Sequence, residues 1–315
     1  MDPAKKSHRK GSQIMDKRVG VLGGGQLGRM LTEAAHRLNI DVAILDTENA
    51  PAKNINTNAR HIDGSFKDGQ DICQLASQCD ILTVEIEHVN VTALEKLSID
   101  SSSLLEVHPS WRTLKVIQDK FLQKEHLRSR SISSPDSRIV SQNTNAELQA
   151  IGSHYGYPFM LKSRMDAYDG RGNFPVRSAA DIQPALEGLG ARPLYAEKWI
   201  NFKCELAVMV VKTDTEPSKN WSSITEAFPV VETVHEDSIC KLVYAPARNV
   251  SNSLALDARA LARSAVATFW GKGIFGVELF LAEDGMMIWN VRRDWSCFAD
   301  LKRNVDGQRD RTAAT

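Results

Sequence analysis

A net charge, a long apolar run and a cysteine cluster are all missing from this sequence of 315 residues, and each absence excludes a class of protein. Its 39 basic residues balance 39 acidic residues, so no overall charge favours binding to nucleic acid or to an acidic membrane. No apolar run approaches the roughly 18 residues of a membrane-spanning helix, and the N-terminus lacks the hydrophobic stretch of a signal peptide. Five cysteines without a CxxC pair or zinc-type spacing favour reduced thiols. We therefore expect a cytoplasmic globular protein without nucleic-acid or membrane partners.

The two ends of the chain differ from its middle. Residues 1–15 carry three lysines and one arginine, which favours a solvated, disordered basic tail over a nuclear-localisation signal. Residues 291–315 contain six basic and four acidic residues and show no sustained period of a helix or a strand. We expect this second segment to be a poorly ordered tail rather than the end of a packed domain.

Between residues 16 and 110, short apolar strands alternate with amphipathic helices. Strands are expected over residues 18–22, 41–45 and 80–84, and apolar residues recur over 27–38 with the spacing of one helix face. Strands that alternate with helices predict a parallel sheet with crossover helices. This part of the sequence therefore predicts an α/β fold of the Rossmann type.

Residues 111–290 show a different pattern. One long amphipathic helix is expected over 111–128, a serine-rich loop follows, and another helix is expected over 254–270. The strands are longer and mostly follow one another directly, which favours an antiparallel sheet. They are expected over residues 158–162, 194–200, 206–212, 228–234, 241–245, 276–281 and 286–290. The second half is therefore predicted to be α+β.

A glycine-rich turn joins the first strand to the first helix. Gly23, Gly25 and Gly28 match the G-x-G-x-x-G pattern, in which glycines permit a close approach of the backbone to a ligand. The amides at the start of the following helix favour a phosphate or carboxylate, and Asp46 stands where a dinucleotide fold places its ribose-binding acid. A nicotinamide-dependent (NAD) dehydrogenase is thus one interpretation. The other is a turn that only packs the helix against the sheet.

A second candidate site follows a predicted strand in the second half. Lys162 at the end of this strand offers a cation to a phosphate, and the next loop carries Asp169, Gly170, Arg171 and Gly172. A loop with two glycines between charged residues can close over a polyphosphate with its amides. The pattern indicates a polyphosphate site, and a solvated charged turn is the alternative.

Two further segments place carboxylates beside apolar residues. Ile200 can cover an adenine ring and Glu205 can accept hydrogen bonds from ribose hydroxyls, although any strand that ends in mixed charge could look the same. Glu278 lies in the apolar stretch 276–280, where a carboxylate needs a partner of opposite charge. Mg²⁺ shared with nucleotide phosphates meets that need, and a salt bridge is the alternative.

Taken in chain order, these residues resemble an ATP-grasp ligase. More narrowly, they resemble the ATP-dependent, N5-carboxyaminoimidazole ribonucleotide synthase part of phosphoribosylaminoimidazole carboxylase. The resemblance covers residues 16–290 and depends on six segments that are weak alone and specific together. These are Gly23–Met30, Thr83–Val89, Gln118–Lys120, Ala167–Asn173, Tyr195–Trp199 and Gly276–Glu278. The implied fold is a Rossmann-like pre-ATP-grasp domain over 16–110 and an ATP-grasp domain over 111–290, with a lid subdomain over about 136–200.

The resemblance also implies an activity. Enzymes of this family use ATP and bicarbonate to form carboxyphosphate, and the amine of 5-aminoimidazole ribonucleotide (AIR) captures its carboxyl group in purine biosynthesis. The implied cofactors are ATP and Mg²⁺, the implied small-molecule partners are AIR, bicarbonate and ATP, and the implied assembly is a homodimer. Fungal relatives carry a fused mutase domain, and we expect that domain to be missing from this chain.

The site residues follow from the resemblance, position by position. Those implied to bind ATP are Lys120, Lys162, Gly170, Gly172, Glu197, Lys198, Ile200 and Glu205. Those implied to bind AIR are Gly25, Gln26, Leu27 and Glu85. Those implied to serve carboxyl transfer are Tyr168, Asp169 and Arg171, with Asp169 handling the proton. The implied metal ligands are Glu278 and Asn290.

The C-terminal segment departs from the family pattern. Val291 stands where the family has a second metal-binding carboxylate, and 292–315 lack the basic segment that helps to seat the substrate phosphate. Loss of a transition-state contact of several kcal/mol lowers a rate by roughly 10²–10³. We therefore expect a truncated or altered C-terminus and weak turnover, and a catalytically inactive ATP-binding remnant is the alternative.

Overall fold

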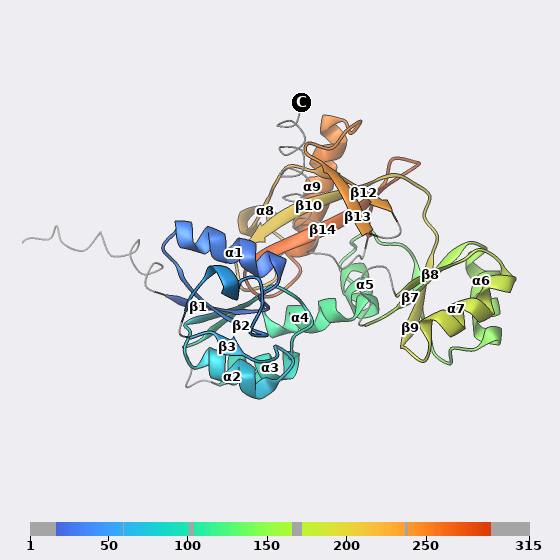
Figure 1. Cartoon of the computed structure of the whole chain (residues 1–315). Coiled ribbons are helices and arrows are strands. Elements are labelled where there is room, and N and C mark those ends of the chain that lie inside the picture. The colour runs from blue at the N-terminus through green and yellow to red at the C-terminus, as the bar shows by residue number, and fades with distance from the viewer. Residues whose placement is uncertain (1–16, 59, 101–103, 166–171, 237–238, 291–315) are drawn as a thin grey trace, which may run out of the picture. The chain divides into compact units, whose positions relative to one another are not determined.

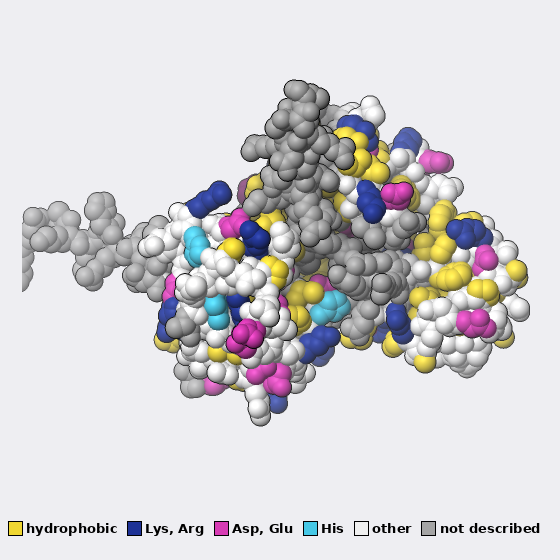
Figure 2. All heavy atoms as spheres, in the orientation of Figure 1, with side chains coloured by type: hydrophobic (Ala, Val, Ile, Leu, Met, Phe, Trp, Pro, Cys, Tyr) yellow, Lys and Arg dark blue, Asp and Glu magenta, His cyan; other side chains and the backbone are white. Residues whose placement is uncertain are grey.

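The computed structural model describes residues 17–58, 60–100, 104–165, 172–236 and 239–290 (Figure 1). The chain divides into two compact units, Met1–Leu114 and Lys115–Thr315, and each is described by itself. In the described ranges, no helix has both the length and the apolar character that crossing a membrane requires. Figure 2 shows basic and acidic side chains interspersed on the visible face of both units, as expected for a chain without net charge.

The first unit is built on a parallel sheet of five strands. Their spatial order is β3 (Ile62–Asp63), β2 (Asp41–Asp46), β1 (Arg18–Leu22), β4 (Ile81–Val84) and β5 (Glu106–His108). The central strand β1 pairs on both sides, with Val21 opposite Ile44 on β2 and opposite Thr83 on β4. The α/β prediction for this half is therefore confirmed.

Three helices connect these strands. They are α1 (Gln26–Arg37), α2 (Gly69–Ala76) and α3 (Val91–Ile99), and a short 3-10 helix spans Lys53–Ile55. Asp68 and Asn90 begin α2 and α3 because their side chains accept hydrogen bonds from amides of the first turn. Ala35 on α1 packs with Val21 and Ile44 of the sheet. The predicted helix over 27–38 corresponds to α1.

The single helix predicted over 111–128 is wrong, because the chain breaks at Asp119. The two helices are α4 (Trp111–Gln118) and α5 (Lys120–Arg128). Asp119 itself is extended, at φ −105° and ψ 107°, and its carboxylate accepts hydrogen bonds from the amides of Phe121 and Leu122. A carboxylate that caps the first turn starts a new helix at a position that apolar periodicity alone reads as helix interior.

A four-stranded antiparallel sheet forms the smaller part of the second unit (Figure 1). Its strands, in spatial order, are β6 (Ser137–Val140), β9 (Leu194–Lys198), β7 (Phe159–Ser163) and β8 (Asn173–Val176). The helices α6 (Asn145–Tyr155) and α7 (Ile182–Leu189) pack on it, with a 3-10 turn over Ala179–Asp181 between β8 and α7. Leu161 and Ala196 on the sheet pack with Ile151 and Ile182 on these helices.

A larger antiparallel sheet forms the rest of the second unit. Its strands, in spatial order, are β13 (Ile239–Tyr244), β12 (Val231–Glu236), β10 (Phe202–Lys212), β14 (Gly273–Ala282) and β15 (Met287–Asn290), and β11 (Thr225–Ala227) also pairs with β10. The short helix α8 (Trp221–Ile224) precedes β11, and the long helix α9 (Asn252–Val266) packs on the sheet. The α+β prediction for this half is confirmed.

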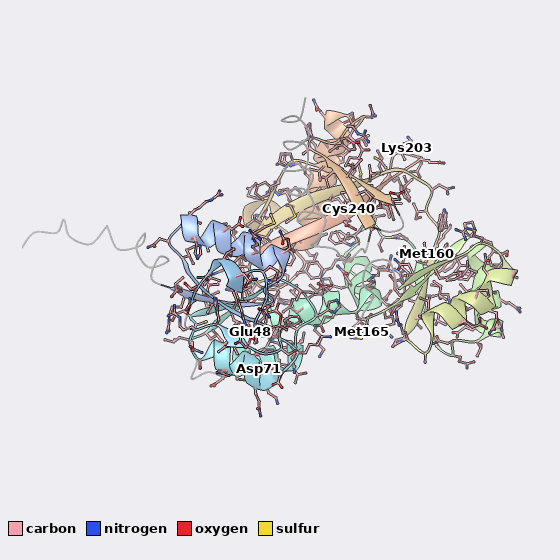
Figure 3. All side chains as sticks on the ribbon, in the orientation of Figure 1. Glu48, Asp71, Met160, Met165, Lys203 and Cys240 are labelled. Carbon is pink, nitrogen blue, oxygen red and sulfur yellow. The ribbon has the colours of Figure 1, made fainter. Side chains whose placement is uncertain are left out.

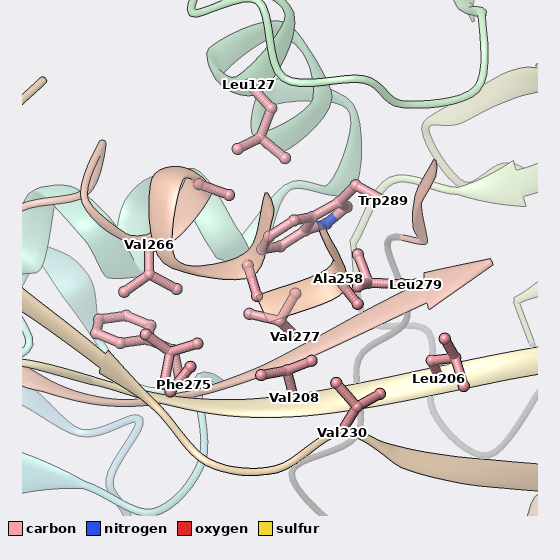
Figure 4. Packing of buried hydrophobic residues seen from close by; sticks show 14 of the residues in the cluster. Leu127, Leu206, Val208, Val230, Ala258, Val266, Phe275, Val277, Leu279 and Trp289 are labelled. Atoms are coloured by element: carbon pink, nitrogen blue, oxygen red, sulfur yellow. The ribbon is translucent and has the colours of Figure 1, made fainter. Parts of the chain in front are cut away.

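The two faces of this larger sheet differ in chemistry. Residues such as Leu206, Val208 and Val277 point into one apolar core with α9 (Figure 4). Directly opposed residues of an antiparallel pair share a face, and Glu205 is opposed to Phe280 on β14. Side chains alternate along a strand, so the face opposite the core carries the polar residues.

The domain limits of 16–110 and 111–290, with the lid over about 136–200, stay predictions.

Candidate functional site

Lys162 and Glu197 form a buried ion pair between neighbouring strands β7 and β9. Lys162 Nζ donates to Glu197 Oε1 at 3.0 Å, and both side chains are more than 90% buried. Both residues were expected at the ATP site. The pairing of β7 with β9 brings them together although 35 positions separate them in the chain.

A third charge joins this pair from α5. Lys124 Nζ lies 2.8 Å from the other carboxylate oxygen, Glu197 Oε2, and the Lys124 side chain is completely buried. Burial alone would raise the pKa of Glu197, but the ammonium groups of Lys124 and Lys162 outweigh it and lower that pKa to about 2. Burial lowers the pKa of Lys124 to about 8, against the opposing effect of Glu197. Sequence reasoning missed Lys124. The only signal for it in the sequence is its position one helical turn after Lys120, which by itself does not indicate a site residue.

Asp119 and Arg164 tie the start of α5 to the end of β7. Arg164 Nη2 donates to Asp119 Oδ2 at 2.5 Å, and the amide of Lys120 donates to the carbonyl of Arg164 at 2.9 Å. Lys120 is itself buried, with 4% of its surface exposed. The two lysines expected to bind phosphates, Lys120 and Lys162, therefore stand on segments that are held side by side.

One cavity of about 200 Å³ collects most of the predicted ATP-binding residues. The predicted residues that line it are Lys162, Glu197, Lys198, Ile200 and Glu205. Sequence reasoning named none of the other lining residues as a ligand, although it placed Asn173 in the loop expected to close over the phosphates; these residues are Met160, Asn173, Trp199, Phe202 and Phe280. Phe202 and Phe280 stack with ring centroids 4.3 Å apart, and Figure 3 labels Met160 on β7. Aromatic and apolar side chains beside a set of charges suit a nucleotide, which has a flat base and anionic phosphates.

Glu205 has a partner that the sequence did not reveal. His235 Nδ1 on β12 lies 3.1 Å from Glu205 Oε2 on the adjacent strand β10, and both side chains are at least 90% buried. The contact arises from strand pairing, in which Thr233 is opposed to Glu205. His235 thus orients the carboxylate that was expected to accept hydrogen bonds from ribose.

Glu278 supplies a carboxylate on the same face of the sheet. It is 7% exposed and is opposed to Ala207 on β10 and, in backbone register, to Asn290 on β15. Within the described residues, no group of three or more His, Cys, Asp or Glu side chains could hold a metal ion. Mg²⁺ binds through one or two carboxylates together with substrate phosphates, so Glu278 fits a metal shared with a nucleotide.

The loop between β7 and β8 carries the residues expected to transfer the carboxyl group. Tyr168, Asp169, Gly170 and Arg171 lie outside the described residues. Gly172 lies at the base of the loop, where its carbonyl accepts a hydrogen bond from the amide of Ser163 at 2.7 Å. The loop therefore begins and ends beside the strand end that carries Lys162.

In the first unit, Glu85 occupies the glycine turn. Its carboxylate accepts hydrogen bonds from the amides of Gly25 at 2.8 Å and Leu27 at 3.1 Å, and Asp46 accepts from the amide of Gly24 at 2.6 Å. Burial raises the pKa of Glu85 in spite of these hydrogen bonds. Gln26 begins α1 beside them. Because carboxylates of the chain itself already satisfy these amides, the geometry does not favour a dinucleotide pyrophosphate there, as a dehydrogenase would require.

A larger cavity of about 530 Å³ lies elsewhere in the second unit. Residues around it include Arg130, Lys219, Trp221 and Thr268. None of the residues predicted for the site lines this larger cavity. Cavity size alone therefore does not identify the functional site.

Comparison with known proteins identifies the class of protein to which this chain belongs. A ribonucleotide synthetase preATP-grasp domain matches residues 15–118, and an ATP-grasp domain matches residues 125–291. In Saccharomyces cerevisiae, phosphoribosylaminoimidazole carboxylase is 50% identical over 277 residues, which are 88% of this chain and 47% of that protein. The chain thus spans about half the length of the curated relatives that it matches.

Two solved structures from Aspergillus clavatus are similar over 87% of this chain. Carboxyaminoimidazole ribonucleotide synthase complexed with ATP is 54% identical, with a TM-score of 0.81 over 69% of that chain. N5-carboxyaminoimidazole synthase in complex with ADP and AIR is 53% identical, with a TM-score of 0.80 over 68% of that chain. The two units therefore have the architecture of an ATP-grasp protein. Within that class, the chain belongs to the family of N5-carboxyaminoimidazole ribonucleotide synthases.

Proposed function

We propose that this chain catalyses the ATP- and bicarbonate-dependent carboxylation of AIR in purine biosynthesis. The observation that carries the proposal is the cavity of about 200 Å³, which combines the buried Lys162–Glu197 pair with Ile200, Glu205 and aromatic side chains. The relative from Aspergillus clavatus, at 54% identity, is complexed with ATP. ATP is therefore the ligand that this cavity is expected to take.

The charges and rings of the cavity suggest how ATP binds. Lys162 and Lys120 hold the phosphates, since Lys162 lies near the end of β7 and Lys120 begins α5, where its amide donates to the carbonyl of Arg164 just after β7. Ile200 and Lys198 frame the adenine together with Glu197, and Glu205, oriented by His235, accepts from the ribose hydroxyls. Charge-assisted hydrogen bonds of this kind are stronger than neutral ones.

Glu278 and Asn290 are proposed to hold Mg²⁺, since they are opposed in register on β14 and β15. When bound, Mg²⁺ would offset the negative charge of the phosphates. The structure describes the backbone of Asn290, and Val291 follows outside the described residues. The missing second carboxylate at Val291 favours a second candidate function, an ATP-binding protein without turnover.

The chemistry has two steps. A bicarbonate oxygen attacks the γ-phosphorus of ATP, which releases ADP and forms carboxyphosphate. The amine of AIR then attacks the carboxyl carbon, phosphate leaves, and Asp169 takes the proton of the amine. Tyr168 and Arg171 of the loop, with Gly170 and Gly172, close over the reacting groups and exclude water from the short-lived carboxyphosphate.

The glycine turn of the first unit is proposed to bind AIR. Gly25 and Leu27 hold the Glu85 carboxylate through their amides, and Gln26 begins α1 beside them, so that Glu85 and Gln26 are the polar groups offered to AIR. The solved relative at 53% identity is in complex with ADP and AIR. We further propose that the protein acts in the cytoplasm as a homodimer.

ADP release tests the proposal. The purified chain, shown to be folded, would be given Mg-ATP and bicarbonate with and without AIR. AIR-stimulated ADP release supports the synthase function, and Lys162→Met should abolish it. Lys96→Met, which changes an exposed lysine on α3, is the matched control and should leave the rate unchanged. ATP binding without ADP release would favour the second candidate function.

A further inference from the structure

Glu197 bridges two buried lysines that come from different elements. Lys162 is on β7 and reaches Oε1, whereas Lys124 is on α5 and reaches Oε2. Lys162 and Glu197 line the cavity, and Lys124 is not among the residues around it. Lys124 therefore lies behind Glu197, where it cannot touch a nucleotide in the cavity.

Specific contacts hold the ammonium group of Lys124 in its buried position. Its side chain is completely buried, and Nζ also donates to the carbonyl of Pro135 at 3.4 Å. A buried ammonium group is costly unless it is paired, and Glu197 supplies that pairing at 2.8 Å. A lysine kept in such a place should have an effect that an apolar side chain would not provide.

Counting charges shows what that effect is. Lys162 and Glu197 alone would form a neutral pair, with the ammonium group of Lys162 engaged by the carboxylate. With Lys124 the cluster carries one net positive charge, and the end of it that faces the cavity is Lys162. In a poorly solvated site, one net charge changes the affinity for a polyanion strongly.

We propose that Lys124 is a positioning residue for the nucleotide site: it neutralises Glu197 from behind, so that Lys162 stays available to the ATP phosphates. This inference depends on the proposed function. The orientation is fixed as well as the charge, because the two lysines hold both carboxylate oxygens of Glu197.

The test is direct binding of Mg-ATP to the full chain, measured by calorimetry. Lys124→Met keeps the length of the side chain and removes its charge. The dissociation constant of ATP should rise at least about tenfold, which corresponds to 1.4 kcal/mol. Glu125→Gln, on the exposed side of the same helix, is the control and should change the constant less than twofold.

A double variant separates positioning from a structural role. Adding Glu197→Gln to Lys124→Met removes the charge that would hold Lys162 and keeps a side chain of the same length to frame the adenine, so the double variant should recover ATP affinity relative to Lys124→Met. If Lys124 only supports packing, the double variant should instead bind ATP no better than the single variant. That result would overturn the inference.

These variants still test the inference if the single variant Lys124→Met does not fold. The comparison then runs between Glu197→Gln and the double variant, and loss of Lys124 should cost less than about threefold in ATP affinity once its partner is neutral. A larger loss overturns the inference. Unaltered chain that is folded and binds no ATP overturns the proposed function, whereas ATP binding that Lys124→Met leaves unchanged overturns only the role of Lys124.

Discussion

Arg164 and Asp119 form a two-point contact in which Nη2 lies 2.5 Å and Nε 3.1 Å from Asp119 Oδ2. The same carboxylate caps α5 through the amides of Phe121 and Leu122. One side chain thus starts a helix and fastens it to the strand that carries Lys162. Both segments that we propose to bind phosphate depend on that carboxylate for their relative position.

Asp119→Ala should lower the free energy of unfolding by about 2–4 kcal/mol, because a helix cap and a largely buried ion pair are lost together. Urea denaturation followed by circular dichroism measures this. Asp284→Ala is a matched control, since Asp284 caps only an exposed turn through the amide of Met286. Equal losses in the two variants would contradict the argument.

His235→Ala should raise the KM for ATP roughly tenfold, because Glu205 loses the buried imidazole that lies 3.1 Å from its Oε2 and orients it. The value of kcat at saturating ATP should change much less. Steady-state kinetics with varied ATP measures both. His154→Ala removes an exposed histidine on α6 and should leave the KM unchanged. An unchanged KM for ATP in His235→Ala would show that ATP binding does not depend on the orientation of the Glu205 carboxylate by His235.

Acid should weaken the second unit through Glu197. Its pKa is lowered from 4.5 to about 2 in the folded chain, so between these values the unfolded chain binds more protons. The free energy of unfolding should therefore fall as the pH falls from 4.5 towards 2. Urea denaturation of Glu197→Gln should show a shallower pH dependence in this window, and the exposed control Glu226→Gln should not. Identical slopes in all three proteins would refute the assignment.

Gly25→Ala should impair AIR binding without changing ATP binding. A Cβ at Gly25 would lie 2.8 Å from Glu85 Oε1, closer than real contacts allow, so the carboxylate must move away from the turn. The KM for AIR should rise at least about tenfold, and the dissociation constant of ATP should stay the same. Gly188→Ala, where the nearest side-chain atom lies 3.8 Å away, is the control. An unchanged KM for AIR in Gly25→Ala would contradict the proposal that Glu85 binds AIR.

The sequence predicted those features of the fold and the site that are encoded by residues close together along the chain. The strand–glycine turn–helix unit of residues 18–37 follows from alternation and helix periodicity, and so does the apolar side of β14. Lys162 was singled out as a cation at a strand end before a glycine-containing loop, and Glu278 because a carboxylate in an apolar strand needs a partner. The residues proposed to bind ATP could be named because six short segments occur in a family-specific order.

What the sequence did not reveal depends on pairing between distant segments. Lys124 and His235 are ordinary residues of a helix and a strand until β9 and β10 bring Glu197 and Glu205 to them. Asp119 looked like the interior of a helix because periodicity averages over a single capping residue. No local pattern encodes these contacts.

The larger sheet of the second unit uses both of its faces, with Leu206 and Val208 in the core and Glu205 at the cavity. A slip of β10 by one residue would exchange these sets and put a leucine into the cavity that we propose for the nucleotide and a carboxylate into the apolar core. Misregistered forms of this sheet are therefore penalised twice, by lost packing and by a buried charge. A strand with two such demands admits one alignment, so correct folding of β10 and assembly of the binding site are a single event.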